Sequence, residues 1–193
     1  MKLLTSIALI ALLGTYYGGK SDGLNWTSEQ LEKANTFALV DSLSEVEKEA
    51  MKYINLCRLY PADFVRIELT DEKTKGMATG NVHSLKGKLK TLPSLPVIQY
   101  DSTMQRDAIC FAEEQYQTGR IGHQRRKCGS NYMAECISYA MSDGLSIAMQ
   151  LYIDEGVPDL GHRKILLTKS YTKGGISFRE HPKNGFCAVL DLR

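Results

Sequence analysis

The residues of this sequence that can carry chemistry are two histidines and a few carboxylates in the C-terminal half of the chain. They are His123, Glu135, Asp154, Glu155 and His162. Two neutral imidazoles with an acidic neighbour can bind a divalent ion such as zinc, with the carboxylate fixing the orientation of a ring. The same set can polarise a water molecule as base and acid near neutral pH, where histidine titrates. These residues therefore predict a metal site with His123 and His162 as ligands, or a metal-free acid-base site.

Each of these residues also has a simpler explanation. An isolated histidine is more often a hydrogen-bonded surface or core group than a ligand. Glu135 can cap an element or pair with Arg125 or Arg126. Asp154 and Glu155 lie at an expected helix end, where acidic side chains are ordinarily solvated. The residues alone leave both explanations open.

Three further features have weaker functional interpretations. His83 and His181 lie in expected loops without a motif, so we expect both on the surface. The basic run 125–127 can attract an anionic lipid or glycan, although three charges in a loop are usually solvated. Cys136 can act as a thiol nucleophile with His162 as its base, but a disulfide or a buried thiol is the more common state of such a cysteine.

Motifs and charge exclude several classes of protein. The chain contains no Walker loop, no dinucleotide fingerprint, no His-Glu-x-x-His helix and no Gly-x-Ser-x-Gly elbow. Its 24 basic and 22 acidic residues leave a formal net charge of +2. Nucleic-acid binding usually requires a much larger basic excess, so no nucleic-acid partner is expected.

The elements that position the site residues are expected to be helices first and strands last. Capping residues and apolar residues at a 3.6-residue period indicate the helices. Alternating apolar and polar residues on both sides of a turn indicate the strands. The run 137–141 is ambiguous between strand and loop. This order favours an α+β fold over a βαβ repeat. The expected elements are a helix over 44–59, a long surface connection over 70–96, a helix from Asp101 or Ser102 to Gly119, a helix from about Leu145 to Glu155 that stops at Gly156, and a hairpin of 175–178 with 186–192.

Several segments follow one another as they do in one family of exported proteins. They are Gly122-His123, AECISY at 134–139, IDEGVPDLGHRK at 153–164 and YTKGGIS at 171–177, preceded by CFAEE at 110–114. In this order they resemble the bacterial branch of the CAP (SCP-like) superfamily, which includes cysteine-rich secretory proteins, antigen 5 and pathogenesis-related 1 proteins. The similarity runs from about Glu45 to the C-terminus.

The resemblance implies a fold and a site. The fold is a three-layer α-β-α sandwich with a large open cleft lined by two histidines and one or two acidic residues. Residue by residue, the resemblance assigns that lining to His123, Glu135, Glu155 and His162. The match to the second acidic residue is ambiguous by one position, between Asp154 and Glu155.

The N-terminus and the cysteines indicate export. The apolar stretch 3–13 has the length of a signal-peptide core and is too short to span a bilayer, although a buried N-terminal helix is the alternative. We expect a signal peptide over 1–19, an N-terminal strap over 20–42 and a CAP domain over 43–193. The chain would then be secreted, or held in the periplasm or cell envelope, and not transmembrane after signal removal. Five cysteines permit two disulfides and one leftover thiol.

Three functions fit these observations. The first is a binding module whose cleft takes a lipid, sterol, peptide or glycan. The second is a hydrolase, a peptidase or esterase, that is zinc-dependent or uses His123, His162 and Glu135 directly. The third is a structural envelope protein with a vestigial cleft. Binding is favoured, because no activated nucleophile is visible.

Overall fold

The computed structural model describes residues 25–193, so the expected signal peptide over 1–19 lies outside the described residues. In this part of the chain, helices precede most of the strands, and the mixed structure is of the α+β class expected from the sequence. The elements are α1 Ser28–Ala34, α2 Glu45–Leu59, α3 Pro61–Ile67, α4 Thr79–Thr91, β1 Gln99–Tyr100, α5 Ser102–Thr118, β2 Ala134–Tyr139, α6 Gly144–Ile153, α7 Gly161–Leu166, β3 Lys173–His181 and β4 Gly185–Leu192.

The four described strands form one mixed sheet in the order β1-β3-β4-β2. β1 runs parallel to β3. β4 pairs antiparallel with both β3 and β2. The β3-β4 pair confirms the expected C-terminal hairpin, and the ambiguous run 137–141 belongs in part to β2.

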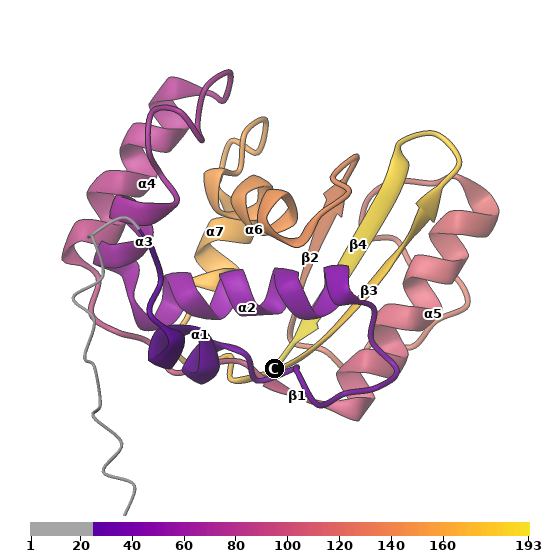
Figure 1. Ribbon diagram of the computed structural model, residues 1–193. Coiled ribbons are helices and arrows are strands. Elements are labelled where there is room, and N and C mark those ends of the chain that lie inside the picture. The colour runs from indigo at the N-terminus through magenta and orange to yellow at the C-terminus, as the bar shows by residue number, and fades with distance from the viewer. Residues whose placement is uncertain (1–24) are drawn as a thin grey trace, which may run out of the picture.

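Helices cover both faces of the sheet (Figure 1). α5 lies on one face, where Phe111 packs with Ile137 and Val189. α2, α6 and α7 lie on the other face, where Cys136 and Leu190 belong to the larger core. Successive residues of a strand point to opposite faces, so both faces of β2 and β4 are apolar and both need a helical cover.

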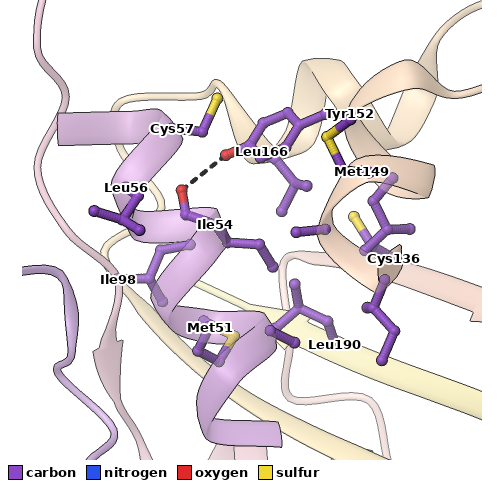
Figure 2. Packing of buried hydrophobic residues seen from close by; sticks show 14 of the residues in the cluster. Met51, Ile54, Leu56, Cys57, Ile98, Cys136, Met149, Tyr152, Leu166 and Leu190 are labelled. Carbon is purple, nitrogen blue, oxygen red and sulfur yellow. Dashed lines mark hydrogen bonds between the residues drawn. The ribbon is translucent and has the colours of Figure 1, made fainter. Parts of the chain in front are cut away.

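The larger core lies between α2, α6 and the sheet, and Figure 2 shows its centre. Met51 and Ile54 of α2 and Tyr152 of α6 are fully buried there. The hydroxyl of Tyr152 donates a hydrogen bond to the carbonyl of Ile54 at 3.0 Å. This large side chain is therefore buried without leaving its polar atom unpaired.

The ends of the two longest helices follow the sequence signals. Ser44 and Glu47 form a capping box at the start of α2, in which each side chain accepts a backbone N–H of the other residue. Asp101 caps α5 by accepting two N–H groups of its first turn. Gly119 ends α5 in the left-handed conformation, at φ 61°.

A glycine in β3 lets α5 lie directly on the sheet. A Cβ at Gly175 would be 2.1 Å from the backbone nitrogen of Gln105. The Gln105 side chain donates to the carbonyl of Ile176 at 2.7 Å and accepts its N–H at 2.9 Å. The amide thus pairs with the edge of β3 beyond the short β1, where backbone groups would otherwise lack partners.

The described part of the strap packs on α2. Ala34 and Phe37 are buried in the larger core. The Asn55 side chain of α2 donates to the carbonyl of Ala34 at 3.1 Å and accepts the N–H of Ile98 at 2.8 Å. The segment after Trp26 therefore shares its core with the rest of the described chain.

The expectation of a long surface connection over 70–96 is wrong for its middle part, because Thr79–Thr91 forms α4. The buried side chains of α4 are Val82, Leu85 and Leu89. Their spacing is that of an amphipathic helix. Two glycines and several lysines and threonines surround these three residues, and such a composition is typical of loops.

The third expected helix also ends two residues early. α6 stops at Ile153, because Asp154 takes the left-handed conformation, with φ 59°. That conformation was expected further on, at Gly156. Aspartate tolerates this region better than most residues other than glycine, so an Asp at a helix end can replace the glycine stop.

The cysteines form one disulfide where their number permits two. Cys110 of α5 is bonded to Cys128 in the following loop. Cys57, Cys136 and Cys187 are free and buried. Burial raises the pKa of the Cys187 thiol to about 12. In the described part of the chain, no helix has the length and apolar character needed to cross a bilayer.

Candidate functional site

The first imidazole of the site is held by a carboxylate on β2. Nδ1 of His123, in the loop after α5, donates to Oε1 of Glu135 at 2.7 Å. The Glu135 side chain is almost fully buried, whereas about half of the His123 side chain is exposed. The hydrogen bond to Glu135 raises the pKa of His123 above its usual value. The carboxylate thus orients the ring and leaves Nε2 for another partner.

Arg125 supports the same carboxylate from the other side. Its guanidinium pairs with Oε2 of Glu135 and donates to both oxygens of Asp191, at 2.6 and 2.8 Å. Asp191 of β4 is the cross-strand neighbour of Glu135. The rings of Phe111 and Tyr132 lie 4.5 and 4.3 Å from the guanidinium carbon, which adds cation-π attraction. The buried guanidinium of Arg125 therefore pairs with two buried carboxylates. Burial raises the pKa of Asp191 to about 7.

The expectation that the basic run 125–127 is solvated is therefore wrong for Arg125. Its side chain is 5% exposed. Arg126 and Lys127 are exposed, and their backbone N–H groups donate to the buried carboxylate of Glu114. The need to pair Glu135 and Asp191 explains why only the first residue of the run turns inward.

The second imidazole is held by the residue that ends α6. Nδ1 of His162, in the first turn of α7, donates to Oδ1 of Asp154 at 2.8 Å. The other oxygen of Asp154 accepts the backbone N–H of Arg163 at 3.1 Å. The buried Arg163 guanidinium donates to the carbonyls of Tyr152 and Ile153, at 2.6 and 2.8 Å. The end of α6 and the start of α7 are thus fixed to one another around His162.

Glu155 lies at the rim of the site. Its side chain is exposed, and Oε2 accepts the backbone N–H of Ala78, before α4, at 3.2 Å. Of the two neighbouring acidic residues, Asp154 is the one that contacts an imidazole. Glu155 still lines the mouth of the same cavity.

Both imidazoles line one cavity between β2, α6 and the loops after α5 and α6. The ring centroids of His123 and His162 are 6.2 Å apart, and the ring planes are inclined by 42°. The cavity has a volume of about 460 Å³, within the range of small-molecule sites. Apart from the histidines and the two acidic residues, its larger lining side chains are mainly apolar: Ile121, Ile137, Tyr139, Leu151 and Val157.

The remaining candidates are placed as follows. The buried thiol expected for Cys136 is confirmed: its sulfur lies 4.0 Å from the backbone carbonyl oxygen of His162, and burial raises its pKa well above the usual value. A thiolate nucleophile at Cys136 is therefore disfavoured. His83 is exposed, as expected, although it lies on α4.

The expectation of a surface position for His181 is wrong. His181 ends β3 and is 2% exposed. Its Nε2 donates to the carbonyl of Arg120 at 3.0 Å, and its Nδ1 accepts the N–H groups of Lys183 and Asn184, each at 3.2 Å. Both ring nitrogens are used in joining the β3-β4 turn to the loop after α5, so the ring is buried with its polar atoms satisfied.

The zinc ion expected from the sequence would need more donors than the two imidazoles provide. His123 and His162 supply two nitrogen donors, and within residues 25–193 no third His, Cys, Asp or Glu joins them in a cluster that could hold a metal ion. Catalytic zinc sites use three protein ligands and structural sites use four. The described residues therefore do not fit a zinc ion.

Neither the protein-family models nor the curated proteins contain a match to the chain. The resemblance to CAP proteins therefore rests on the sequence motifs alone.

Proposed function

We propose that this chain is an exported CAP-type protein whose cleft binds an amphiphilic ligand. The observation that carries the proposal is the pair of carboxylate-oriented imidazoles, His123 and His162, in a cavity whose other walls are mainly apolar. Small-molecule sites typically combine such an apolar lining with a few fixed polar groups.

Four observations support the CAP-type assignment and the export. Helices on both faces of the sheet are what a three-layer α-β-α sandwich requires, and the CAP-like segments lie on α5, β2, α7 and β3. The apolar stretch 3–13 and the Cys110–Cys128 disulfide fit a secreted, periplasmic or envelope protein.

The lining of the cavity favours some ligand classes over others. Ile121, Leu151 and Val157 can bury an acyl chain, a sterol or an apolar peptide side chain. The imidazole Nε2 atoms can bond a carboxylate, hydroxyl or carbonyl at its polar end. A glycan offers little apolar surface to these walls, so a lipid, sterol or peptide fits better.

The proposal is tested with dodecanoate as the probe, by calorimetry. We expect saturable binding that the double change Ile121→Ser and Val157→Ser weakens about tenfold or more, because it removes apolar contact at two walls. Leu39→Ser is the control, since Leu39 is 94% exposed and outside the lining of this cavity. Equal losses in both variants, or no saturable binding to the wild type, would refute the proposal.

His162→Ala gives a second arm of the same experiment. A binding module keeps measurable dodecanoate binding after this change, weakened about 10- to 150-fold, because one hydrogen bond to the charged carboxylate contributes about 1.5–3 kcal/mol. Complete loss of dodecanoate binding in a correctly folded His162→Ala protein would mean that the imidazole does more than hold the polar end.

A metal-free hydrolase is the second candidate, and one observation favours it. Both Nδ1 atoms are bound by carboxylates, which leaves two Nε2 atoms able to accept or donate a proton in one cavity. This function requires turnover of p-nitrophenyl butyrate or of a dye-labelled casein. Turnover must fall about 10²-fold or more in His162→Ala, with the fold retained in circular dichroism.

A further inference from the structure

A second cavity lies beside the histidine cleft, at the C-terminal end of α5. Its volume is about 350 Å³, and it shares the lining residues Ile121 and Gly122 with the histidine cleft. The β3-β4 turn closes it from the other side, and Figure 1 shows this turn next to the end of α5. The two cavities therefore lie on either side of one loop.

Three cationic side chains line this second cavity: Arg120, Arg126 and Lys183. Among the ion pairs of the described chain, none involves any of these three. The cavity contains one carboxylate, that of Glu114, and this group already accepts the backbone N–H of Arg126 at 3.0 Å. The lining therefore carries an excess of positive charge with no partner in the described protein.

The backbone that carries these cations is fixed by buried groups. Glu114, which is 6% exposed, holds the backbone at Arg126. The buried ring of His181 bonds both the carbonyl of Arg120 and the N–H of Lys183. All three cations are thus attached to anchored backbone, which lowers the entropy lost when they converge on a ligand.

Lys183 lies beside Gly119 at the end of α5, and both residues line the cavity. Gly119 has φ 61°, and a Cβ there would lie 3.4 Å from Cε of Lys183. The stem of the lysine therefore packs against the end of α5. The side-chain amides of Gln124 and Asn184 also line the cavity and add neutral donors.

From this arrangement we infer that the second cavity is a binding site for a phosphate or sulfate group. Guanidinium and ammonium groups form charge-assisted hydrogen bonds with such oxyanions, and arginine can bind them through two donors. An excess of cations over carboxylates suits a dianion better than a neutral group. The site is independent of the ligand proposed for the histidine cleft.

The inference is tested with inorganic phosphate at constant ionic strength, following backbone amides by NMR. We expect saturable shifts confined to the end of α5, the loop after it and the β3-β4 turn, over residues 111–126 and 182–184. The change Arg126→Gln with Lys183→Gln should weaken phosphate binding at least about tenfold, because it removes two charge-assisted contacts. The matched control is Arg106→Gln with Lys90→Gln, two exposed cations outside the cavity lining, which should change the affinity less than about twofold.

Non-saturating shifts, or an equal loss in the control pair, would overturn the site. Vesicles of phosphatidylglycerol, with phosphatidylcholine vesicles as reference, separate the two sources of the group. Phosphatidylglycerol binding that free phosphate displaces would identify a lipid headgroup, and phosphate binding without vesicle binding would identify a soluble phosphorylated compound. Vesicle binding that phosphate does not displace and that survives the Arg126/Lys183 change would contradict the inference.

Discussion

The two histidines differ in how their carboxylates are supported. Glu135, which holds His123, also pairs with Arg125 and lies beside Asp191. Asp154, which holds His162, instead accepts a hydrogen bond from the backbone N–H of Arg163. His123 therefore belongs to a network of four ionisable groups, and its protonation should respond to changes within that network.

We predict that the pKa of His123 lies above 6.5 and that Glu135→Gln lowers it. The hydrogen bond to the carboxylate is the main cause of the raised pKa, and a neutral amide favours the charged imidazole much less. Because the folded pKa is the higher one, this pairing contributes stability below pH 6.5 that is lost as the pH rises through the folded value. Imidazole NMR against pH measures the shift. Asp154→Asn, which leaves Glu135 intact, should not move the titration of His123, and an unchanged pKa in Glu135→Gln would contradict the prediction.

Arg125→Met should destabilise the protein by about 3–5 kcal/mol, because it leaves two buried carboxylates without their cation. Urea unfolding at pH 8 measures the loss. Arg106→Met, at an exposed arginine of α5, should change the free energy of unfolding by no more than about 0.5 kcal/mol. A loss below about 1 kcal/mol for Arg125→Met would mean that Glu135 and Asp191 do not depend on it.

Sequence reasoning found both histidines and Glu135, because the CAP-like segments assign these positions to the lining of a cleft. It missed Asp191, and it gave Arg125 only as one of two possible ion-pair partners of Glu135, a pairing that the structure confirms. A signal for Asp191 was present: a charged residue inside the apolar run 186–192 needs a partner if that run is a buried strand. For Arg125 the neighbouring Arg126 is chemically identical, so only the folded backbone could distinguish the residue that turns inward.

Among the helices, α2 and α5 were predicted well from their capping residues. Ser44, Glu47, Asp101 and Gly119 bond or shape the backbone of the helix end next to them, so their effect can be seen in the local sequence. α4 was missed, because its three buried residues are supported by packing on α3 and α6 and little by its own composition. The two residues of β1 are defined by pairing with β3, which no local pattern reveals. Local signals thus predicted the capped helices α2 and α5, whereas tertiary contacts determine α4 and β1.

α5 lies directly on β3 at Gly175, where there is no room for a Cβ atom. Gly175→Ala should destabilise the protein by about 1–3 kcal/mol, because the new methyl group would meet the backbone of α5. Gly87→Ala is the matched control, because Gly87 lies inside α4 with open space around it. It should stabilise the protein by about 0.5–1 kcal/mol. Urea unfolding compares the two, and a neutral Gly175→Ala would mean that α5 can move away from the sheet without cost.

For the whole molecule, the site depends on two parts that lie far apart in the sequence. The loop after α5 supplies His123, and the junction of α6 and α7 supplies His162. β2 lies between these parts and carries Glu135 and Ile137. The α+β order could be predicted from the sequence, and the CAP resemblance placed both histidines in one cleft. How the two imidazoles meet required the sheet order, in which β2 forms an edge.

The most direct test of the account is a titration with dodecanoate that follows the side-chain imidazole signals of His123 and His162 by NMR. If the two rings serve one cleft, both signals shift and saturate with the same dissociation constant, and Ile121→Ser with Val157→Ser weakens both shifts together. Saturable binding that moves neither ring, or that moves only one of them, would contradict a single ligand site built on the two histidines.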